Sequence, residues 1–250
     1  MCSENKESIM LINCDMGESF GPWEMGQDEL IMPYIDMANI ACGMHASDPN
    51  VIKKTVQLAN KHNVQIGAHP GYADLQGFGR RHITMSSEEL ESLFIYQLGA
   101  LQGICISENT EIRYVKPHGA LYNDMMSSDT IFKTLLTALS KYNATLPLMI
   151  MAVPDKQHYI DMADRHGIQL IFEAFIDRSY QKDGRLTPRS APNSIHETVD
   201  AVLGQVESLV KQQRVISVCG EPVLINADTL CIHGDGHLAL EIAKNLRQRL

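Results

Sequence analysis

The chain has 250 residues, of which 44% are hydrophobic, and a formal net charge of −9. This length and apolar content suffice for one α/β barrel domain spanning residues 1–250, and a second domain is not required. The negative charge argues against nucleic acid and anionic membranes as partners, because both favour a basic face. No apolar run reaches the ~20 residues that cross a bilayer, and the polar N-terminus lacks a signal-peptide core, so we expect a cytoplasmic protein. None of the six cysteines forms a CxxC pair, which favours reduced, mostly structural thiols.

Short apolar segments alternate with mostly helical stretches along the chain. The pattern predicts seven strands, at 9–15, 36–42, 64–71, 111–121, 146–153, 168–175 and 229–235. Apolar spacing and start signals such as Asp48-Pro49 predict helices at about 49–60, 86–107, 129–142, 155–166, 194–213 and from 236 to the end. Segments 216–218 and 223–225 are weaker strand candidates. About seven strand–helix units indicate an α/β barrel.

Six of the seven predicted strands lead directly into polar, catalytically capable side chains. In a barrel enzyme the active site lies at the C-terminal ends of the strands, so this placement predicts an enzyme with one cleft at that rim. In chain order the side chains are Asp15 and Glu18, Cys42 and His45, His69, Lys116 and His118, Glu173 with Asp177 and Arg178, and His233 with Asp235.

Three histidines and one carboxylate in this set have the chemistry of a metal site. Asp15, His45 and His69, with His118, suit a divalent transition metal such as zinc, manganese or cobalt. They follow four different strands, so only a barrel would bring them together. The sequence has no HExxH signature, and the same histidines also suit hydrogen bonding or general acid–base work without a metal.

The remaining carboxylates and the single strand-end lysine suggest proton transfer and charge stabilisation. Glu18, Glu173, Asp177 and Asp235 can orient a histidine or act as a base toward water. Turn stabilisation is the alternative for Glu18 and Asp177, and capping of the last helix for Asp235. Lys116 can polarise a carbonyl or hold a phosphate, with a side chain that reaches solvent as the alternative.

Two loops carry arginines that can grip an anion. The glycine-rich loop 71–81 includes Arg80, and the second loop, 176–192, includes Arg178. Either guanidinium can bind a carboxylate or a phosphate. The alternative is that these arginines only keep the surface soluble. Neither a Walker A loop nor a G-x-S-x-G elbow is present in the sequence. Cys42 is a candidate nucleophile, although a small buried residue in a tight turn is the favoured explanation.

The same segments resemble the LamB/YcsF family. The resemblance runs from about residue 9 to the last helix, in the same order, through NCDMGESFG (13–21), ANIACGMHASDP (38–49), GAHPGYADLQGFGRR (67–81), VKPHGALYN (115–123), EAFIDRSY (173–180) and IHGD (232–235). Departures from the family pattern are Met44, Ser47 and Ala73, and SAPNSI after Pro188-Arg189, which leaves the shape of loop 176–192 open.

This resemblance implies a distorted (β/α) barrel similar to the glycoside hydrolase/deacetylase barrels. It also implies ATP-dependent opening of 5-oxo-L-proline to L-glutamate, with ATP as co-substrate of a complex with 5-oxoprolinase subunits B and C. Since the chain lacks a nucleotide loop of its own, the partners would handle much of the ATP chemistry. The family blocks carry over, as catalytic residues, onto Asp15, Glu18, His69, Lys116, His118, Glu173, Asp177, His233 and Asp235, and, as substrate contacts, onto Asn39, His45, Arg80 and Arg178.

Two other functions fit the sequence. One is a stand-alone metal-dependent amidohydrolase or sugar deacetylase that uses Asp15, His45 and His69. The other is a noncatalytic subunit that binds a lactam or a carbohydrate. If partners dock, they should do so near the barrel mouth, where an unstable intermediate is kept from bulk water. Trp23, Met25 and Phe78 are candidates for that rim, with local loop packing as the alternative.

Overall fold

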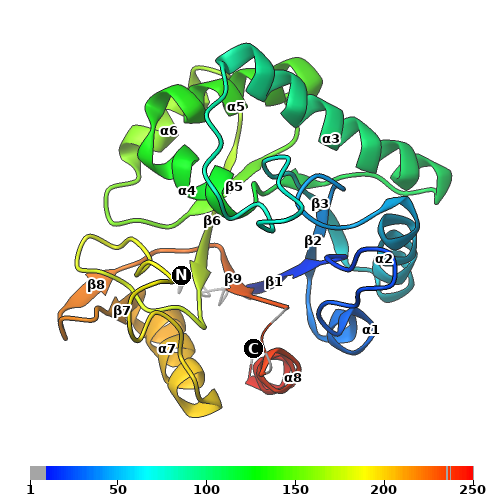
Figure 1. Ribbon diagram of the computed structural model, residues 1–250. Coiled ribbons are helices and arrows are strands. Elements are labelled where there is room, and N and C mark those ends of the chain that lie inside the picture. Colours follow the sequence, from blue (N-terminus) through cyan, green and yellow to red (C-terminus); the bar gives the residue numbers. More distant parts are fainter. Residues whose placement is uncertain (1–9, 235, 237, 250) are drawn as a thin grey trace, which may run out of the picture.

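The computed structural model describes residues 10–234, 236 and 238–249, and this part of the chain forms a closed barrel of seven parallel strands (Figure 1). The predicted barrel class and strand number are confirmed. Around the barrel the strands are β1 (Leu11–Met16), β2 (Met37–Ala41), β3 (Gln65–His69), β4 (Tyr114–Val115), β5 (Leu148–Met151), β6 (Leu170–Phe175) and β9 (Thr229–Ile232). Because β9 pairs with both β6 and β1, the last strand closes the barrel against the first.

Helices surround the barrel on its outside (Figure 1). They are α1 (Asp28–Ile31), the 3-10 helix η1 (Met32–Tyr34), α2 (Pro49–His62), α3 (Ser87–Ser107), α4 (Gly119–Ser127), α5 (Asp129–Asn143), α6 (Gln157–Asp164), α7 (Val199–Gln212) and α8 (Ala239–Arg249). The two weaker strand candidates form an antiparallel hairpin outside the barrel, β7 (Arg214–Ile216) and β8 (Pro222–Leu224).

Among the boundaries that differ from the prediction, two differ most. The strand expected over 111–121 is only two residues long, and its end turns into α4 because Gly119 adopts φ 54, a left-handed conformation that stops an extended chain. The helix expected from 194 begins at Val199, where the Thr198 side chain caps it by accepting from the Ala201 N–H.

The starts of α2 and α3 are where the sequence places them. Asp48 accepts hydrogen bonds from the backbone N–H groups of Asn50 and Val51, and Pro49 follows as the first residue of α2. Ser86 and Glu89 form a reciprocal capping box at the start of α3. These caps fix where each helix leaves the C-terminal rim and so fix the loops that carry functional side chains.

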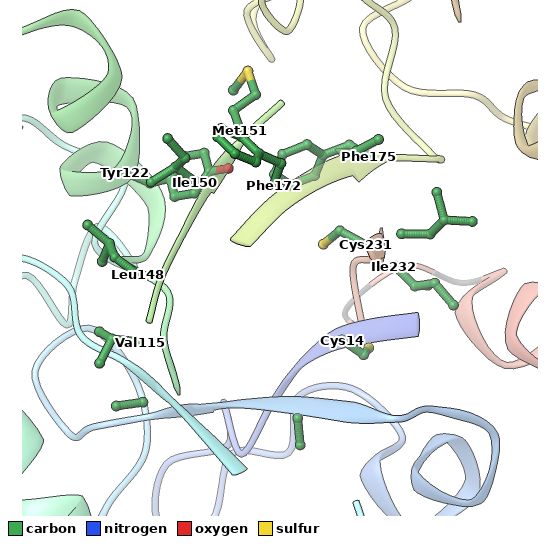
Figure 2. Close-up of a cluster of buried hydrophobic side chains, with 14 of the residues drawn as sticks. Cys14, Val115, Tyr122, Leu148, Ile150, Met151, Phe172, Phe175, Cys231 and Ile232 are labelled. Atoms are coloured by element: carbon green, nitrogen blue, oxygen red, sulfur yellow. The ribbon is translucent and has the colours of Figure 1, made fainter. Parts of the chain in front are cut away.

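The outward side of the strands packs against the helices. Successive residues of a strand point to opposite sides, so alternate positions form this layer. Figure 2 shows it from several strands, with Cys14 of β1, Val115 of β4, Leu148 and Ile150 of β5, Phe172 of β6 and Ile232 of β9. All of these side chains are buried, which anchors the barrel wall beneath the rim.

The inward side changes from apolar to polar along the barrel axis. At the N-terminal end, Met37, Tyr114 and Met149 form a separate buried cluster, with Leu11 and Ile171 against it. Gly67 leaves room for the Tyr114 ring, because a Cβ at this position would collide with it. The next inward positions carry the buried polar side chains of Asn13, Asn39, Lys116 and Glu173. The apolar end therefore closes the barrel, and the polar end opens toward the predicted site.

One described helix, α3, is long and apolar enough to cross a membrane by length and composition alone. It packs against α5, α2 and β3 as part of the outer layer of the barrel. A core helix passes the same test, so α3 is weak evidence for a membrane span.

Candidate active site

A cavity of about 560 Å³ lies at the C-terminal ends of the barrel strands. Its apolar wall includes Tyr122, Met126, Met151, Val153 and Phe175, and residues 185–190 form one side. Tyr122, Met151 and Phe175 appear together in Figure 2. The polar lining includes Asp15, Glu18, His69, Arg80, Lys116, His118, Arg178 and His233. Eight of the side chains predicted from sequence thus line one cleft, whereas Asn39, Cys42, His45, Glu173 and Asp177 are not among its lining residues.

Lys116 is the centre of a buried polar network. Its Nζ lies 2.9 Å from Glu173 Oε2, 3.0 Å from Asp15 Oδ1 and 3.2 Å from Asn13 Oδ1. Cys231 Sγ lies 3.2 Å from the same nitrogen. Three ammonium protons are therefore shared among four partners, so Lys116 acts on the cavity through its charge rather than through a free N–H.

The charges in this network stabilise one another. Burial alone would lower the pKa of Lys116, but Asp15 and Glu173 raise it well above its usual range. Burial alone would raise the pKa of Asp15, but Lys116 and His69 hold it well below its usual range. Asn39 also donates to Asp15 Oδ1 at 2.8 Å, and Tyr114 donates to Asn39 at 2.6 Å. The ammonium and the carboxylate are both charged at neutral pH.

A second cluster, which we call the histidine cluster, consists of Glu18, His45, His69 and His118. One candidate ligand atom from each lies within 4.8 Å of every other, so this group could hold a metal ion. Its side chains are buried, and the parallel rings of His45 and His118 stack at 3.7 Å between centroids. Burial lowers the pKa of His118 to about 3 and that of His45 well below its usual range, so both rings are neutral at neutral pH.

The histidine cluster differs in membership from the predicted set of Asp15, His45 and His69. Asp15 Oδ1 is 3.5 Å from His69 Nε2 but is engaged by Lys116 and Asn39. Glu18 takes the carboxylate position instead, because Gly17 adopts φ 69 and turns the chain at the end of β1. That turn breaks the strand periodicity on which the sequence reasoning depended.

Asp177 and His233 form a carboxylate–imidazole pair at the cavity wall. The Nδ1 of His233 lies 2.8 Å from Asp177 Oδ2, and its ring stacks on Phe175 at 5.5 Å. Burial would raise the pKa of Asp177, but His233 lowers it, so the carboxylate is ionised and accepts the Nδ1 proton. This fixes the tautomer that exposes Nε2 as a proton acceptor. Asp235, also a predicted catalytic residue, lies outside the described residues.

Arg178 joins the cavity to the loop that covers it. Its Nε donates to Ser194 O at 3.0 Å and its Nη2 donates to Thr187 O at 2.6 Å. Burial and the nearby Arg189 lower its pKa to about 10, which leaves it a cation at neutral pH. Arg80, Arg185 and Arg189 also line the cavity, so its mouth is strongly positive.

Several residues of the site have no clear sequence signal. Asn13, Cys231 and Tyr122 surround Lys116 or Glu173, and their residue types are as common in cores as in sites. Phe78, a candidate for the docking rim with local loop packing as the alternative, packs its ring edge-on against His45 and His118. Cys42 is buried, donates to Ile40 O, and has a pKa raised by burial to about 12, so the thiol is structural rather than nucleophilic. The described cysteines 14, 42, 105, 219 and 231 are all free.

A closed parallel barrel with a polar cavity at the C-terminal ends of its strands defines the class of (β/α)-barrel proteins whose active sites lie at that end. Within this class, the chain belongs to the LamB/YcsF family, whose pattern matches residues 10–250. The family resemblance read from the sequence is therefore confirmed.

Curated relatives match over nearly their whole length. A protein of Vibrio campbellii, named as the A subunit of 5-oxoprolinase, is 52% identical over 241 residues, covering 96% of this chain and 95% of that protein. A protein of the same name from Pseudomonas fluorescens is 44% identical and covers 97% of each chain.

Solved structures agree with the fold. The lactam utilization protein of Thermus thermophilus superposes with a TM-score of 0.87 at 36% identity, covering 96% of this chain and 94% of that one. A putative cellobiose-phosphate cleavage protein of Enterococcus faecalis superposes with a TM-score of 0.54 at 12% identity, covering 95% and 90%, and supports the fold alone.

Proposed function

We propose that this chain is the A subunit of a 5-oxoprolinase and that the cavity opens the lactam ring of 5-oxo-L-proline to give L-glutamate. The observation that carries the proposal is the placement of the Asp177–His233 pair, the buried Lys116 ammonium and the arginines around one cavity. The names of relatives 52% identical over almost the full chain support the same activity.

The chemistry of the substrate explains the need for ATP. A five-membered lactam is an unstrained amide, and phosphorylation of its oxygen makes the ring carbon a better electrophile. His233 would take a proton from the attacking water, because Asp177 holds the ring in the tautomer with Nε2 free of hydrogen. The arginines at the mouth would hold the phosphate and the substrate carboxylate.

Partner subunits B and C would deliver the phosphoryl group. The sequence has no Walker A loop, and the relatives are named as one component of an enzyme that has several. We therefore assign ATP to the complex as co-substrate. We also propose that the assembly is cytoplasmic, as expected from the sequence.

The test is ATP-dependent release of glutamate from 5-oxoproline by the purified chain, by subunits B and C, and by the mixture of all three. We expect activity only in the complete mixture with ATP. Full activity from the chain alone would refute the need for partners. An inactive complete mixture that still binds 5-oxoproline would favour a noncatalytic lactam-binding subunit.

A second function has one observation in its favour. The histidine cluster resembles the donor set of metal-dependent hydrolases, as expected for a stand-alone amidohydrolase or sugar deacetylase. The same assay separates the two, because hydrolysis of 5-oxoproline or of an acetylated sugar by the metal-loaded chain without ATP would favour this second function.

A further inference from the structure

Hydrogen bonds fix the tautomers of two rings in the histidine cluster. His69 Nδ1 lies 2.7 Å from Lys116 O, and His118 Nε2 lies 2.8 Å from Phe78 O. A backbone carbonyl only accepts, so each of these two nitrogens carries a hydrogen. The other nitrogens, His69 Nε2 and His118 Nδ1, are left facing each other at 3.0 Å.

Two neutral imidazoles in this arrangement point lone pairs at one another. A neutral ring has a single N–H, and both rings use theirs on the outer carbonyls. The facing lone pairs repel at 3.0 Å unless a positive charge lies beside them. That charge is either a proton shared by the two nitrogens or a cation bound by both.

The other two members of the cluster distinguish the proton from the cation. Glu18 Oε1 lies 3.8 Å from both His45 Nε2 and His118 Nδ1. His45 is fully buried, and neither of its ring nitrogens has a hydrogen-bond partner among the residues that the structure describes. A shared proton would provide a partner only for His69 and His118, whereas one metal ion could be bound by all four side chains.

We propose that Glu18, His45, His69 and His118 bind a divalent transition metal ion. Three imidazoles and one carboxylate favour zinc, cobalt or manganese over magnesium and calcium, which prefer all-oxygen sites. Histidines that donate their outer N–H to a backbone carbonyl are typical metal ligands, because that bond fixes the ring and its tautomer. Asp15 lies beside this site and stays paired with Lys116.

The site opens toward the cavity. Glu18, His69 and His118 line the cavity, whereas His45 lies behind them and is fully buried. A bound ion supplies a Lewis acid that polarises a carbonyl or activates water. This role in lactam opening rests on the proposed function, but binding of the ion does not.

The test measures the ion itself on the isolated full-length chain. The protein is stripped with a chelator, titrated calorimetrically with Zn²⁺ and with Co²⁺, and analysed for bound metal after gel filtration. We expect one ion per chain, visible Co²⁺ absorption of a nitrogen-containing site, and a Tm raised by roughly 5–10 °C at a hundredfold excess of ion over its Kd.

Variants then test the ligand set. Glu18→Gln, His45→Gln and His69→Gln should each weaken binding by more than about 100-fold. His158→Gln removes a half-exposed histidine and should change nothing, whereas Asp15→Asn should keep one ion per chain. Circular dichroism checks that each variant folds. The metal-dependent Tm shift is measured on the wild-type chain, so this test holds even if a variant fails to fold.

Two results would overturn the inference. One is a wild-type chain that binds neither ion, with a nitrogen NMR spectrum showing a proton shared by His69 and His118. The other is loss of the ion in Asp15→Asn but not in Glu18→Gln. Glutamate release by a metal-free complete complex would support the proposed function and show that the ion takes no part in it. A chain that binds the ion, but whose complete complex releases no glutamate, would support the metal site and contradict the proposed function.

Discussion

The Nζ of Lys116 lies 2.9 Å from Oε2 of Glu173, and both side chains are almost completely buried. A second carboxylate, that of Asp15, lies 3.0 Å from the same nitrogen. One ammonium therefore holds two negative charges inside the barrel, and its removal should affect stability as well as catalysis.

Lys116→Met should lower turnover of the complete complex by about 100-fold or more, because one electrostatic contact to a developing charge is lost. It should also lower the free energy of unfolding by about 3–5 kcal/mol, since the carboxylates are left without a counter-ion. The double variant Lys116→Met/Glu173→Gln removes one of those charges and should regain part of the stability without regaining turnover. Recovery of both would mean that Lys116 has only a structural role.

We expect ionisation of Asp28 to lower the free energy of unfolding as pH rises. Burial raises its pKa to about 6, against the opposing effect of the hydrogen bond from the Gly17 N–H, so the folded state binds a proton between pH 4 and 6 that the unfolded state releases. Asp28→Asn should therefore raise Tm at pH 7.5, by on the order of 5 °C, and give no gain near pH 4. Glu24→Gln, which removes the same charge at an exposed position, serves as the control. An equal gain at both pH values would contradict the assignment.

Gly79 packs closely against both stacked histidines. An added Cβ would lie 2.7 Å from His45 Cβ and 2.8 Å from His118 Cδ2, and φ is 61. Gly79→Ala should cost about 1–3 kcal/mol of stability and abolish activity of the complex. Gly99→Ala on the exposed face of α3, where a Cβ meets nothing within 4 Å, should instead stabilise the chain by about 0.5–1 kcal/mol. Denaturant titration and glutamate release measure both, and an active Gly79→Ala complex would argue against the histidine cluster.

Arg178 should hold the cavity loop closed. Arg178→Lys leaves at least one of the carbonyls of Ser194 and Thr187 without its donor, which costs about 1.5 kcal/mol or more and raises loop opening roughly tenfold. Limited trypsin digestion should then cleave faster after Lys182, Arg185 or Arg189. Arg165→Lys at the exposed end of α6 is the matched control, and unchanged cleavage in Arg178→Lys would contradict this role.

Trp23 should contribute to partner binding. Its side chain is 70% exposed, stacks on Phe20 and lies on the loop that follows β1, next to the half-exposed Met25. Trp23→Ser should leave the Tm of the isolated chain unchanged and weaken its co-purification with subunits B and C. A complex of unchanged affinity would place the docking surface elsewhere.

The sequence predicts the barrel and the position of its cleft because both depend on local patterns. Apolar segments followed by polar residues place Lys116, His69 and Glu173 at one end of parallel strands, and Asp48-Pro49 marks a helix start. Each of these signals lies within a few residues of the feature that it indicates, so no tertiary knowledge is needed.

The partners of each side chain are not predictable in this way. Asn13 and Cys231 meet at Lys116 only because β1 and β9 close the barrel, and the sequence does not state that pairing. The choice between Asp15 and Glu18 depends on one left-handed glycine at 17. Long-range closure and single backbone turns therefore decide the composition of the site.

Closure of β1 against β9 has a consequence for synthesis of the chain. Asn13 donates to the Thr229 hydroxyl, which lies 216 positions later in the chain. The first strand can therefore pair with β9 only after almost the whole polypeptide has been synthesised. During translation the inward carboxylates and the ammonium of Lys116 remain open to water, since the gap between β6 and β1 is filled only when β9 leaves the ribosome. A nascent or C-terminally truncated chain would thus expose charged interior side chains beside the apolar inward cluster. Hydration of the charged groups would oppose collapse of the polar end until the final strand arrives.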